Sequence, residues 1–334
     1  MLGVQNRTIH VFLILFSLAL VDCAITIARR VALARDSVVI HSSAVLLVNE
    51  FLKLSFCLVQ VARSSRNRPG QTLRKYFTNF LRGALQLFPV CLLYLLANLI
   101  SYAALRRITA SVFAAISQLK VLTTAFFAVV ILGNKISWRR WRTLTVLTLA
   151  VMIITLSSQP KRDDTFRQTG FDDALSPNDY IWGAALAFLQ TVFTGLACII
   201  LEMRLKDLES NPDEQCGDAL RDIWDRNLQL SFCSILIYAP LVLVQTDGKT
   251  TQNWSTVASL ISVLHALGGI LVALSIVYTS SVAKTIAVCA GLTLTSLLGG
   301  TFGDSPPTVD GSLACVIVVL MIIGYRDDIT LEVS

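Results

Sequence analysis

The chain has 334 residues and a formal net charge of +6, with 54% hydrophobic and only 15% charged residues. A soluble domain carries roughly 25% charged residues, so this composition excludes an ordinary soluble protein and indicates an integral membrane protein. Most basic residues lie in short loops, which favours a role in membrane orientation over nucleic-acid binding.

Ten apolar runs are candidates for membrane-spanning helices, each of which needs about 20 residues. In chain order they cover residues 11–28, 42–61, 84–104, 111–132, 143–156, 181–201, 228–244, 257–277, 282–302 and 308–324. We expect the fifth run to extend toward 141 and 158, and the ends of the fifth and tenth are the hardest to place. The runs are too long and continuous for barrel strands, so the sequence predicts an all-α integral membrane fold with ten transmembrane helices.

The loops between these runs differ in basic content. With a cytosolic N-terminus, the loops on that side hold 16 of the 28 basic residues, and the opposite loops hold nine. The excess of positive charge predicts that both termini are cytosolic. The glycosylation sequon at Asn253 would then be luminal and the one at Asn6 cytosolic, and whether Asn253 carries a glycan stays open.

A polar loop near the middle of the chain, "SQPKRDDTFRQTGFDDALSPNDY", separates five runs from five. Two like halves with an odd number of spans cross the membrane in opposite senses, which is the inverted-repeat plan of many transporters. We therefore expect a first five-helix half at 1–160, a luminal linker at 161–179 and a second five-helix half at 180–334. In such a plan the substrate site lies between the halves, near the midplane.

Three lysines, Lys53, Lys120 and Lys284, lie within the apolar runs. A lysine at the centre of a spanning helix costs about 2.5–3.5 kcal/mol to insert, and such residues usually mark a substrate pathway. Glu50 precedes Lys53 by one turn, so we expect a structural ion pair there, with a cavity role as the alternative. Lys120 and Lys284 have no acidic residue close in sequence. Snorkelling could account for Lys284 near its helix end, but an anionic ligand is the expected partner of Lys120.

Other polar and aromatic residues share helix faces within these runs. They are Phe113 and Ser117 beside Lys120, Tyr94 and Asn98 in the third run, Asn227 and Ser231 in the seventh, and Thr295 in the ninth. Aromatic rings could stack on a base and asparagine could bond its edge, whereas interhelical packing is the alternative for any single Ser or Thr. Glu202 and Arg204 end the sixth run, and we expect them at the membrane interface.

Four segments together resemble one known family. They are "SSAVLLVNEFLKL" at 42–54, "ALRRITASVFAAISQLKVLTTAFF" at 104–127, "RNLQL" at 226–230 and "GGILVALSIVYTSSVAKTIA" at 268–287. They resemble the nucleotide-sugar transporters of the drug/metabolite transporter superfamily, in particular the branch of CMP-sialic acid and UDP-galactose carriers.

The resemblance implies ten helices in two inverted halves that exchange cytosolic nucleotide sugar for luminal nucleoside monophosphate, without cofactor, metal or enzymatic activity. It implies that Lys120 and Lys284 lie near the substrate phosphates. With the residues above, the expected substrate-binding set is Lys120, Lys284, Asn98, Phe113, Ser117, Gln118, Asn227, Ser231, Cys233, Tyr94 and Thr295. Ser280 and Ser281 stand where the family has Asp-Asn, so the sugar and the choice between uracil and cytosine stay open.

A UDP-sugar such as UDP-galactose or UDP-N-acetylglucosamine is the favoured substrate. CMP-sialic acid transport and carriage of another organic anion are the alternatives, and a polytopic enzyme is disfavoured because no H-E-x-x-H or H-x-x-x-x-D pattern is present. The expected location is the Golgi membrane, with the endoplasmic reticulum left open. The expected partners are the two nucleotides and the lipid bilayer, without nucleic acid. Homo-oligomers and association with glycosyltransferases stay open.

Overall fold

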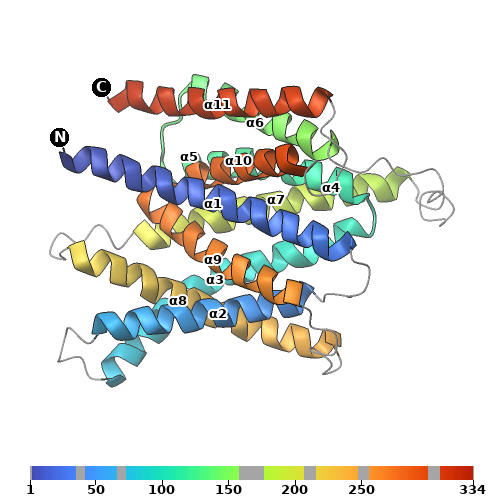
Figure 1. Ribbon diagram of the computed structural model, residues 1–334. Helices are drawn as coiled ribbons and strands as arrows, with labels where there is room; N and C mark the ends of the chain where they lie inside the picture. The colour runs from blue at the N-terminus through green and yellow to red at the C-terminus, as the bar shows by residue number, and fades with distance from the viewer. Residues whose placement is uncertain are drawn as a thin grey trace. The chain divides into compact units, whose positions relative to one another are not determined.

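The computed structural model describes residues 2–34, 42–65, 73–157, 177–206, 216–246, 256–299 and 309–333. Within these ranges every regular element is an α-helix, which confirms the all-α expectation (Figure 1). The helices are α1 (Leu2–Ala34), α2 (Ser42–Ser65), α3 (Leu73–Leu105), α4 (Ala110–Ser117), α5 (Lys120–Leu132), α6 (Trp138–Ser157), α7 (Pro177–Lys206), α8 (Cys216–Thr246), α9 (Thr256–Tyr278), α10 (Ser281–Gly299) and α11 (Val309–Val333).

Eight spans in the described part of the chain are long and apolar enough to cross a membrane. They fall on α1, α2, α3, α4 together with α5, α6, α7, α9 and α10. The expected seventh and tenth spans coincide with α8 and α11, and the apolar part of α11 is the shorter stretch Val309–Tyr325. The protein is therefore a multi-pass membrane protein, and the count of ten spans stays a prediction.

Several helices begin well before the apolar runs that predicted them. α3 begins at Leu73 and α8 at Cys216. In both, the helix extends beyond the apolar run into polar sequence. These two polar extensions contact each other, since the Tyr76 hydroxyl donates to Asp225 Oδ1 at 2.8 Å. Apolar runs therefore locate the membrane-embedded part of each helix but underestimate its length.

The chain forms two compact units. The first consists of Met1–Leu92 and Ile200–Lys284, and the second of Leu93–Ile199 and Thr285–Ser334. In the first unit α2 lies along α8 and α1 packs on α9 (Figure 1). Its packing includes a buried cluster of small and branched apolar residues, namely Ala28, Val45, Ala258 and Ile261.

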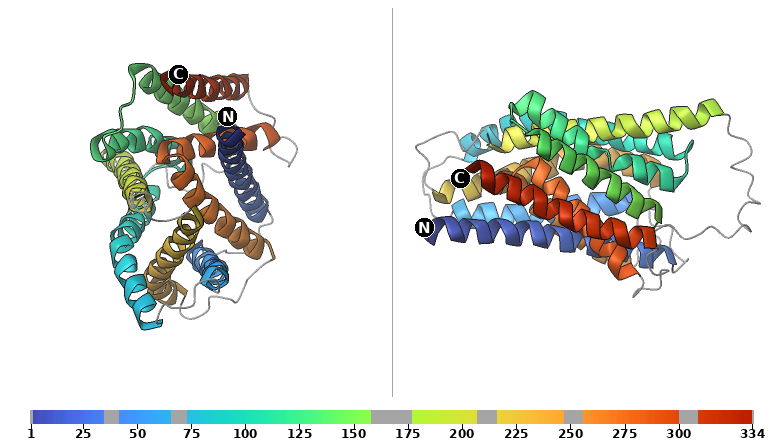
Figure 2. Two further views of the ribbon diagram at one scale, coloured as in Figure 1. Left: turned by 90° about the vertical axis from the view of Figure 1, so that its left-hand side faces the viewer. Right: turned by 90° about the horizontal axis from the view of Figure 1, so that it is seen from above.

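The second unit is built around α6. The C-terminal helix α11 lies beside α6 (Figures 1 and 2), and α4 and α5 also contact α6. Ala104, Ile108 and Ala187 form a buried cluster in this unit. Each unit takes helices from both the N-terminal and the C-terminal part of the chain, and the division into five-helix halves at 1–160 and 180–334 stays a prediction.

Candidate functional site

Lys120 lies where the fourth span changes from one helix to the next. α4 ends at Ser117 and α5 begins at Lys120. The amides of Gln118 and Leu119 bond three residues back, each at 3.0 Å, so the backbone tightens into a 3₁₀-type turn. The sequence indicated one uninterrupted helix here, because neither Gly nor Pro marks the turn. The Lys120 side chain is half-buried, and it forms no ion pair with any residue that the structure describes.

The start of α5 is held tightly against α7. Thr123 Oγ1 donates to the Thr191 carbonyl at 3.1 Å. A Cβ atom on Gly195 would lie 2.7 Å from Thr123 Oγ1 and 3.1 Å from the Thr124 amide nitrogen. Small residues allow helices to approach this closely in membranes. The contact fixes the backbone one turn beyond Lys120.

Phe113, Ser117 and Gln118 lie on the α4 side of the same turn. The Ser117 hydroxyl donates to the Phe113 carbonyl at 2.8 Å, so its hydrogen is used within the helix. Gln118 Nε2 donates to the Ala114 carbonyl at 3.1 Å. Gln118 Oε1 is buried and has no hydrogen-bond partner among the described residues. Because buried polar atoms are normally paired, this oxygen is an open acceptor two residues from Lys120.

Three further candidates of the second unit differ in how their polar atoms are used. The Tyr94 hydroxyl lies 3.3 Å from Cys198 Sγ. Asn98 is half-buried, and its carbonyl accepts a hydrogen bond from Ser101 at 2.7 Å. Thr295 is buried, and its hydroxyl donates to the Gly291 carbonyl of its own helix at 2.9 Å. Tyr94 and Asn98 therefore keep part of their surface accessible, whereas Thr295 is enclosed.

Lys284 lies in the first turn of α10, directly after the break that separates α10 from α9. Its amide donates to the Ser280 carbonyl at 3.0 Å, and its side chain is half-buried. Lys120 is the first residue of α5 and likewise follows a break between helices, and the two lysines belong to different units. A helix N-terminus carries the positive end of the helix dipole, which favours an anion. At these two starts the amides of Leu119 and Val121 already bond to the preceding turn, and the Ser281 amide already bonds to Glu202.

The candidates on α8 are enclosed by protein. Asn227 and Ser231 are buried, and Asn227 Nδ2 donates to the Ile223 carbonyl at 2.9 Å. Cys233 is also buried, and its thiol donates to the Ala84 carbonyl of α3 at 3.3 Å. Cys233 packs there with Cys91 in an apolar cluster of the first unit. The remaining acceptor capacity of Asn227 and Ser231 is what these side chains can offer a ligand.

Glu50 and Lys53 form a buried ion pair on α2, with Lys53 Nζ 2.6 Å from Glu50 Oε1. The stem of Lys53 lies against α9, where a Cβ atom on Gly269 would come within 2.8 Å of Lys53 Cδ. Glu50 Oε2 and the neighbouring Asn49 Oδ1 are buried without hydrogen-bond partners among the described residues. The two charges of the pair neutralise each other, and one acceptor atom of Glu50 and one of Asn49 stay open.

Glu202 is a charged residue whose burial within protein the sequence did not predict. Its side chain has 0% exposure, and its place at the membrane interface stays a prediction. It pairs with Lys206 at 2.7 Å, four residues later on α7. The spacing of the two residues was a usable signal, since opposite charges four positions apart share a helix face.

A family model described as nucleotide-sugar transporter matches residues 6–326. The chain belongs to the nucleotide-sugar transporter family. Every candidate site residue lies within the matched range, and the resemblance inferred from the sequence is confirmed.

Named relatives of this transporter cover most of its length. It is 27% identical over 266 residues to the UDP-galactose transporter of Schizosaccharomyces pombe, covering 77% of this chain and 69% of the relative. It is 25% identical to the UDP-N-acetylglucosamine transporter of Rattus norvegicus, covering 86% and 85%, and 26% identical to UDP-galactose translocator 1 of Caenorhabditis elegans, covering 85% and 78%. A solved crystal structure with 14% identity and a TM-score of 0.59 covers 93% of this chain and 94% of its own, which supports the fold alone.

The candidate residues of the transporter fall into two groups by what their polar atoms already contact. The side-chain donors of Ser117, Asn227 and Thr295 are used by their own helices. In the described part of the chain, Lys120 has no ion-pair partner and Gln118 Oε1 has no hydrogen-bond partner. A ligand near Lys120 would therefore supply an ion pair and a hydrogen bond that the described residues do not provide. The substrate-binding roles stay predictions.

Proposed function

We propose that this nucleotide-sugar transporter carries a UDP-sugar, such as UDP-galactose or UDP-N-acetylglucosamine, into the lumen in exchange for a nucleoside monophosphate. The observation that carries the proposal is Lys120, a half-buried lysine at the start of α5 that lacks an ion-pair partner among the described residues. The choice of UDP-sugars is supported by relatives that are named as UDP-galactose and UDP-N-acetylglucosamine transporters.

The charges of the two exchanged molecules fit this role. A nucleotide sugar carries two phosphate charges, and a nucleoside monophosphate carries about 1.5 to 2 near neutral pH, as other phosphomonoesters do. Each molecule therefore carries enough negative charge to offset a lysine such as Lys120. The neutral sugar alone does not, which gives the site a physical reason to accept both exchange partners and to reject free sugar.

The proposed architecture places ten spans in two inverted halves, residues 1–160 and 180–334, with both termini in the cytosol. It rests on the sixteen-to-nine distribution of basic residues and on the equal division of apolar runs around the central loop. We propose the Golgi membrane as the location, with the endoplasmic reticulum as the second membrane to test. Luminal glycosyltransferases consume the product of this transport, so association with them, or of the carrier with itself, belongs to the same proposal and is tested by co-purification.

Uptake by proteoliposomes tests the substrate class. The purified transporter is reconstituted into vesicles preloaded with UMP, CMP or GMP and offered UDP-galactose, UDP-N-acetylglucosamine, CMP-sialic acid and free galactose. We expect uptake of at least one UDP-sugar into vesicles that contain UMP, and no uptake of free galactose. Uptake of CMP-sialic acid alone would replace the proposal by its cytosine alternative, and uptake of no nucleotide sugar would refute it.

The exchange mechanism is tested with the same vesicles. A carrier that changes sides most readily when its lysines are neutralised takes up nucleotide sugar faster into vesicles that contain monophosphate. Empty vesicles of the same preparation are the control. Equal initial rates in loaded and empty vesicles would contradict exchange and leave simple facilitated transport.

A further inference from the structure

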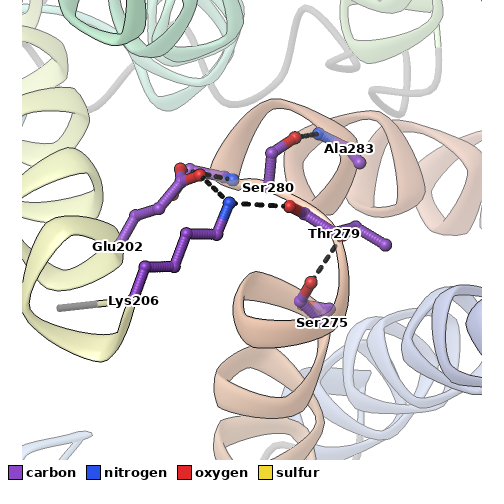
Figure 3. A network of polar contacts seen from close by, with 7 residues as sticks. Glu202, Lys206, Ser275, Thr279, Ser280 and Ala283 are labelled. Atoms are coloured by element: carbon purple, nitrogen blue, oxygen red, sulfur yellow. Dashed lines mark hydrogen bonds and ion pairs between the residues drawn. The ribbon is translucent and has the colours of Figure 1, made fainter. Parts of the chain in front are cut away.

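An ion pair on α7 contacts both sides of the break between α9 and α10 (Figure 3). Glu202 Oε1 lies 2.7 Å from Lys206 Nζ, and Glu202 Oε2 accepts a hydrogen bond of 2.8 Å from the Ser281 amide. Lys206 Nζ also donates to the Thr279 carbonyl at 2.9 Å. Two charged side chains thus join Thr279, which directly follows α9, to the first residue of α10.

The contacts match the electrostatics of the two helix ends. The last carbonyls of a helix and the first amides of the next lack partners within their helices, and the dipole makes the former negative and the latter positive. Lys206 binds the carbonyl end of α9, and Glu202 binds the amide end of α10. Hydrogen bonds to ionised groups are the strong ones, and Glu202 makes them at 0% exposure.

Short contacts connect this clamp, Glu202 with Lys206, to Lys284. Ser281, whose amide Glu202 binds, lies three residues before Lys284 in the first turn of α10. Ser280 Oγ accepts a hydrogen bond from the Ala283 amide at 3.2 Å, and the Ser280 carbonyl accepts one from the Lys284 amide at 3.0 Å. The backbone that carries Lys284 is therefore anchored to α7 at its point of entry into α10.

We propose that Glu202 and Lys206 are positioning residues for Lys284, holding the α9–α10 break in the geometry in which Lys284 meets the substrate phosphate. The inference rests on the proposed function, in which Lys284 contacts phosphate. The clamp acts through the backbone of residues 279–284. Its loss therefore weakens recognition of the phosphate and leaves recognition of the nucleoside unchanged.

Two substitutions remove the clamp with little change of shape. In Glu202→Gln the side chain keeps its size, but an amide accepts at one atom only, so its NH₂ group must face either the Ser281 amide or Lys206 as donor against donor. Lys206→Met keeps a long side chain without the charge that binds Glu202 and the Thr279 carbonyl. Lys206→Arg keeps the positive charge and is the rescue variant. Ser262→Ala on α9 is the matched control, because it removes a buried hydroxyl that bonds only within its own helix, at 2.9 Å.

The measurement is competition for UDP-sugar uptake in proteoliposomes by UMP and, separately, by uridine, which has no phosphate. We expect Glu202→Gln and Lys206→Met to raise the inhibition constant of UMP about tenfold, a typical size for coupling between sites. The inhibition constant of uridine stays unchanged in both, and Lys206→Arg restores most of the UMP affinity. A general loss of correctly folded carrier lowers the maximal rate but does not change the ratio of the two constants.

Lys284→Gln, measured in parallel, distinguishes a failure of the positioning role from a failure of the proposed function. If Lys284→Gln weakens UMP selectively while Glu202→Gln and Lys206→Met behave like Ser262→Ala, the positioning role is refuted and the proposed function stands. A proportional rise of both constants in the clamp variants would also refute it, since that result describes a general structural contact. If Lys284→Gln leaves UMP competition unchanged, the phosphate role of Lys284 fails, and the positioning inference fails with it.

Discussion

A lysine within an apolar helix costs free energy unless an opposite charge or water accompanies it, and two lysines of this transporter meet that cost differently. Lys53 has Glu50 at 2.6 Å on the same helix, so its charge is compensated within the protein. Lys120 has no such partner in the described residues, and an open acceptor, Gln118 Oε1, lies beside it in sequence. We propose that a substrate phosphate compensates the charge of Lys120.

Lys120→Gln removes this charge and keeps most of the side-chain length. We expect membrane insertion to be retained, because the costly group is gone, and binding of both UDP-sugar and UMP to fall about 10- to 100-fold. That range follows from the roughly 1.5–3 kcal/mol of a hydrogen bond to a charged group. Binding is measured by ligand-dependent thermal shift of the purified carrier, with Lys120→Arg as the charge-retaining control. A variant that inserts and binds both ligands as tightly as the wild type would show that Lys120 is structural.

Gly195 sets the closeness of α7 to the segment that follows Lys120. Gly195→Ala places a Cβ atom 2.7 Å from Thr123 Oγ1 and 3.1 Å from the Thr124 amide nitrogen, so the Thr123 hydroxyl or the backbone of α5 must shift. We expect a loss of about 1–3 kcal/mol in stability, as for other overpacked sites, together with weaker transport. Gly324→Ala is the control, because nothing lies within 4 Å of its added Cβ and alanine favours a helix. Equal melting temperatures for the two variants would contradict this account of the contact.

Two of the charged residues within the spans lie at or near the start of a helix. Lys120 begins α5 and Lys284 lies in the first turn of α10, so each expected phosphate ligand follows a break between two helices. α5 ends at Leu132 and is capped by Gly133, which has a φ of 68° in the left-handed region. The Gly133 amide bonds to the Ala128 carbonyl, which closes the helix. The length of α5 is thus fixed by a turn at each end.

Gly133→Ala tests the C-terminal turn of α5. No atom lies within 4 Å of the added Cβ, so the cost comes from the left-handed backbone, about 1–2 kcal/mol for a residue with a side chain. We expect a lower melting temperature of the purified carrier at unchanged UMP affinity, because the site is at the other end of the helix. Gly133→Asn should lose less, since asparagine tolerates this conformation. Equal losses for alanine and asparagine would argue that something other than backbone conformation is disturbed.

At the scale of the whole molecule, basic residues are distributed unevenly between the two sides of the membrane, which predicts the orientation of the chain. Sixteen basic residues fall on one side and nine on the other when the N-terminus is cytosolic. Large apolar side chains such as Phe12, Leu85 and Val130 are exposed on the protein surface, as expected where a surface faces lipid rather than water. Orientation therefore depends on the loops, whereas the apolar surface fixes only depth.

Glycan mapping tests the orientation. The sequon at Asn253 is expected to face the lumen, and the sequon at Asn6 to face the cytosol. Asn253 is close to an expected span, so a longer acceptor loop inserted at 161–179 serves as the luminal control. We expect the inserted sequon to gain a glycosidase-sensitive mass and Asn6 to gain none. A glycan on Asn6 would reverse the orientation.

The sequence by itself determined the membrane class, the approximate position of the spans and the charged residues that need explanation. It did so because lipid offers no hydrogen bonds to the backbone, which makes each span satisfy its own backbone as a helix with an apolar surface. The Glu50–Lys53 spacing was readable for the same reason, since both partners lie on one helix. The family followed from residues quoted along the chain, and its model covers 6–326.

Only the tertiary structure decided how the charged residues are held. The turn between α4 and α5 occurs in apolar sequence without Gly or Pro, and Thr123 there bonds to α7, which is 68 residues away in the chain. Glu202 is enclosed within protein because the first residue of α10 brings its backbone amide to the carboxylate. Such contacts depend on which helices become neighbours. The hydrophobic pattern of a membrane helix does not predict its neighbours, because lipid-facing and protein-facing positions are equally apolar.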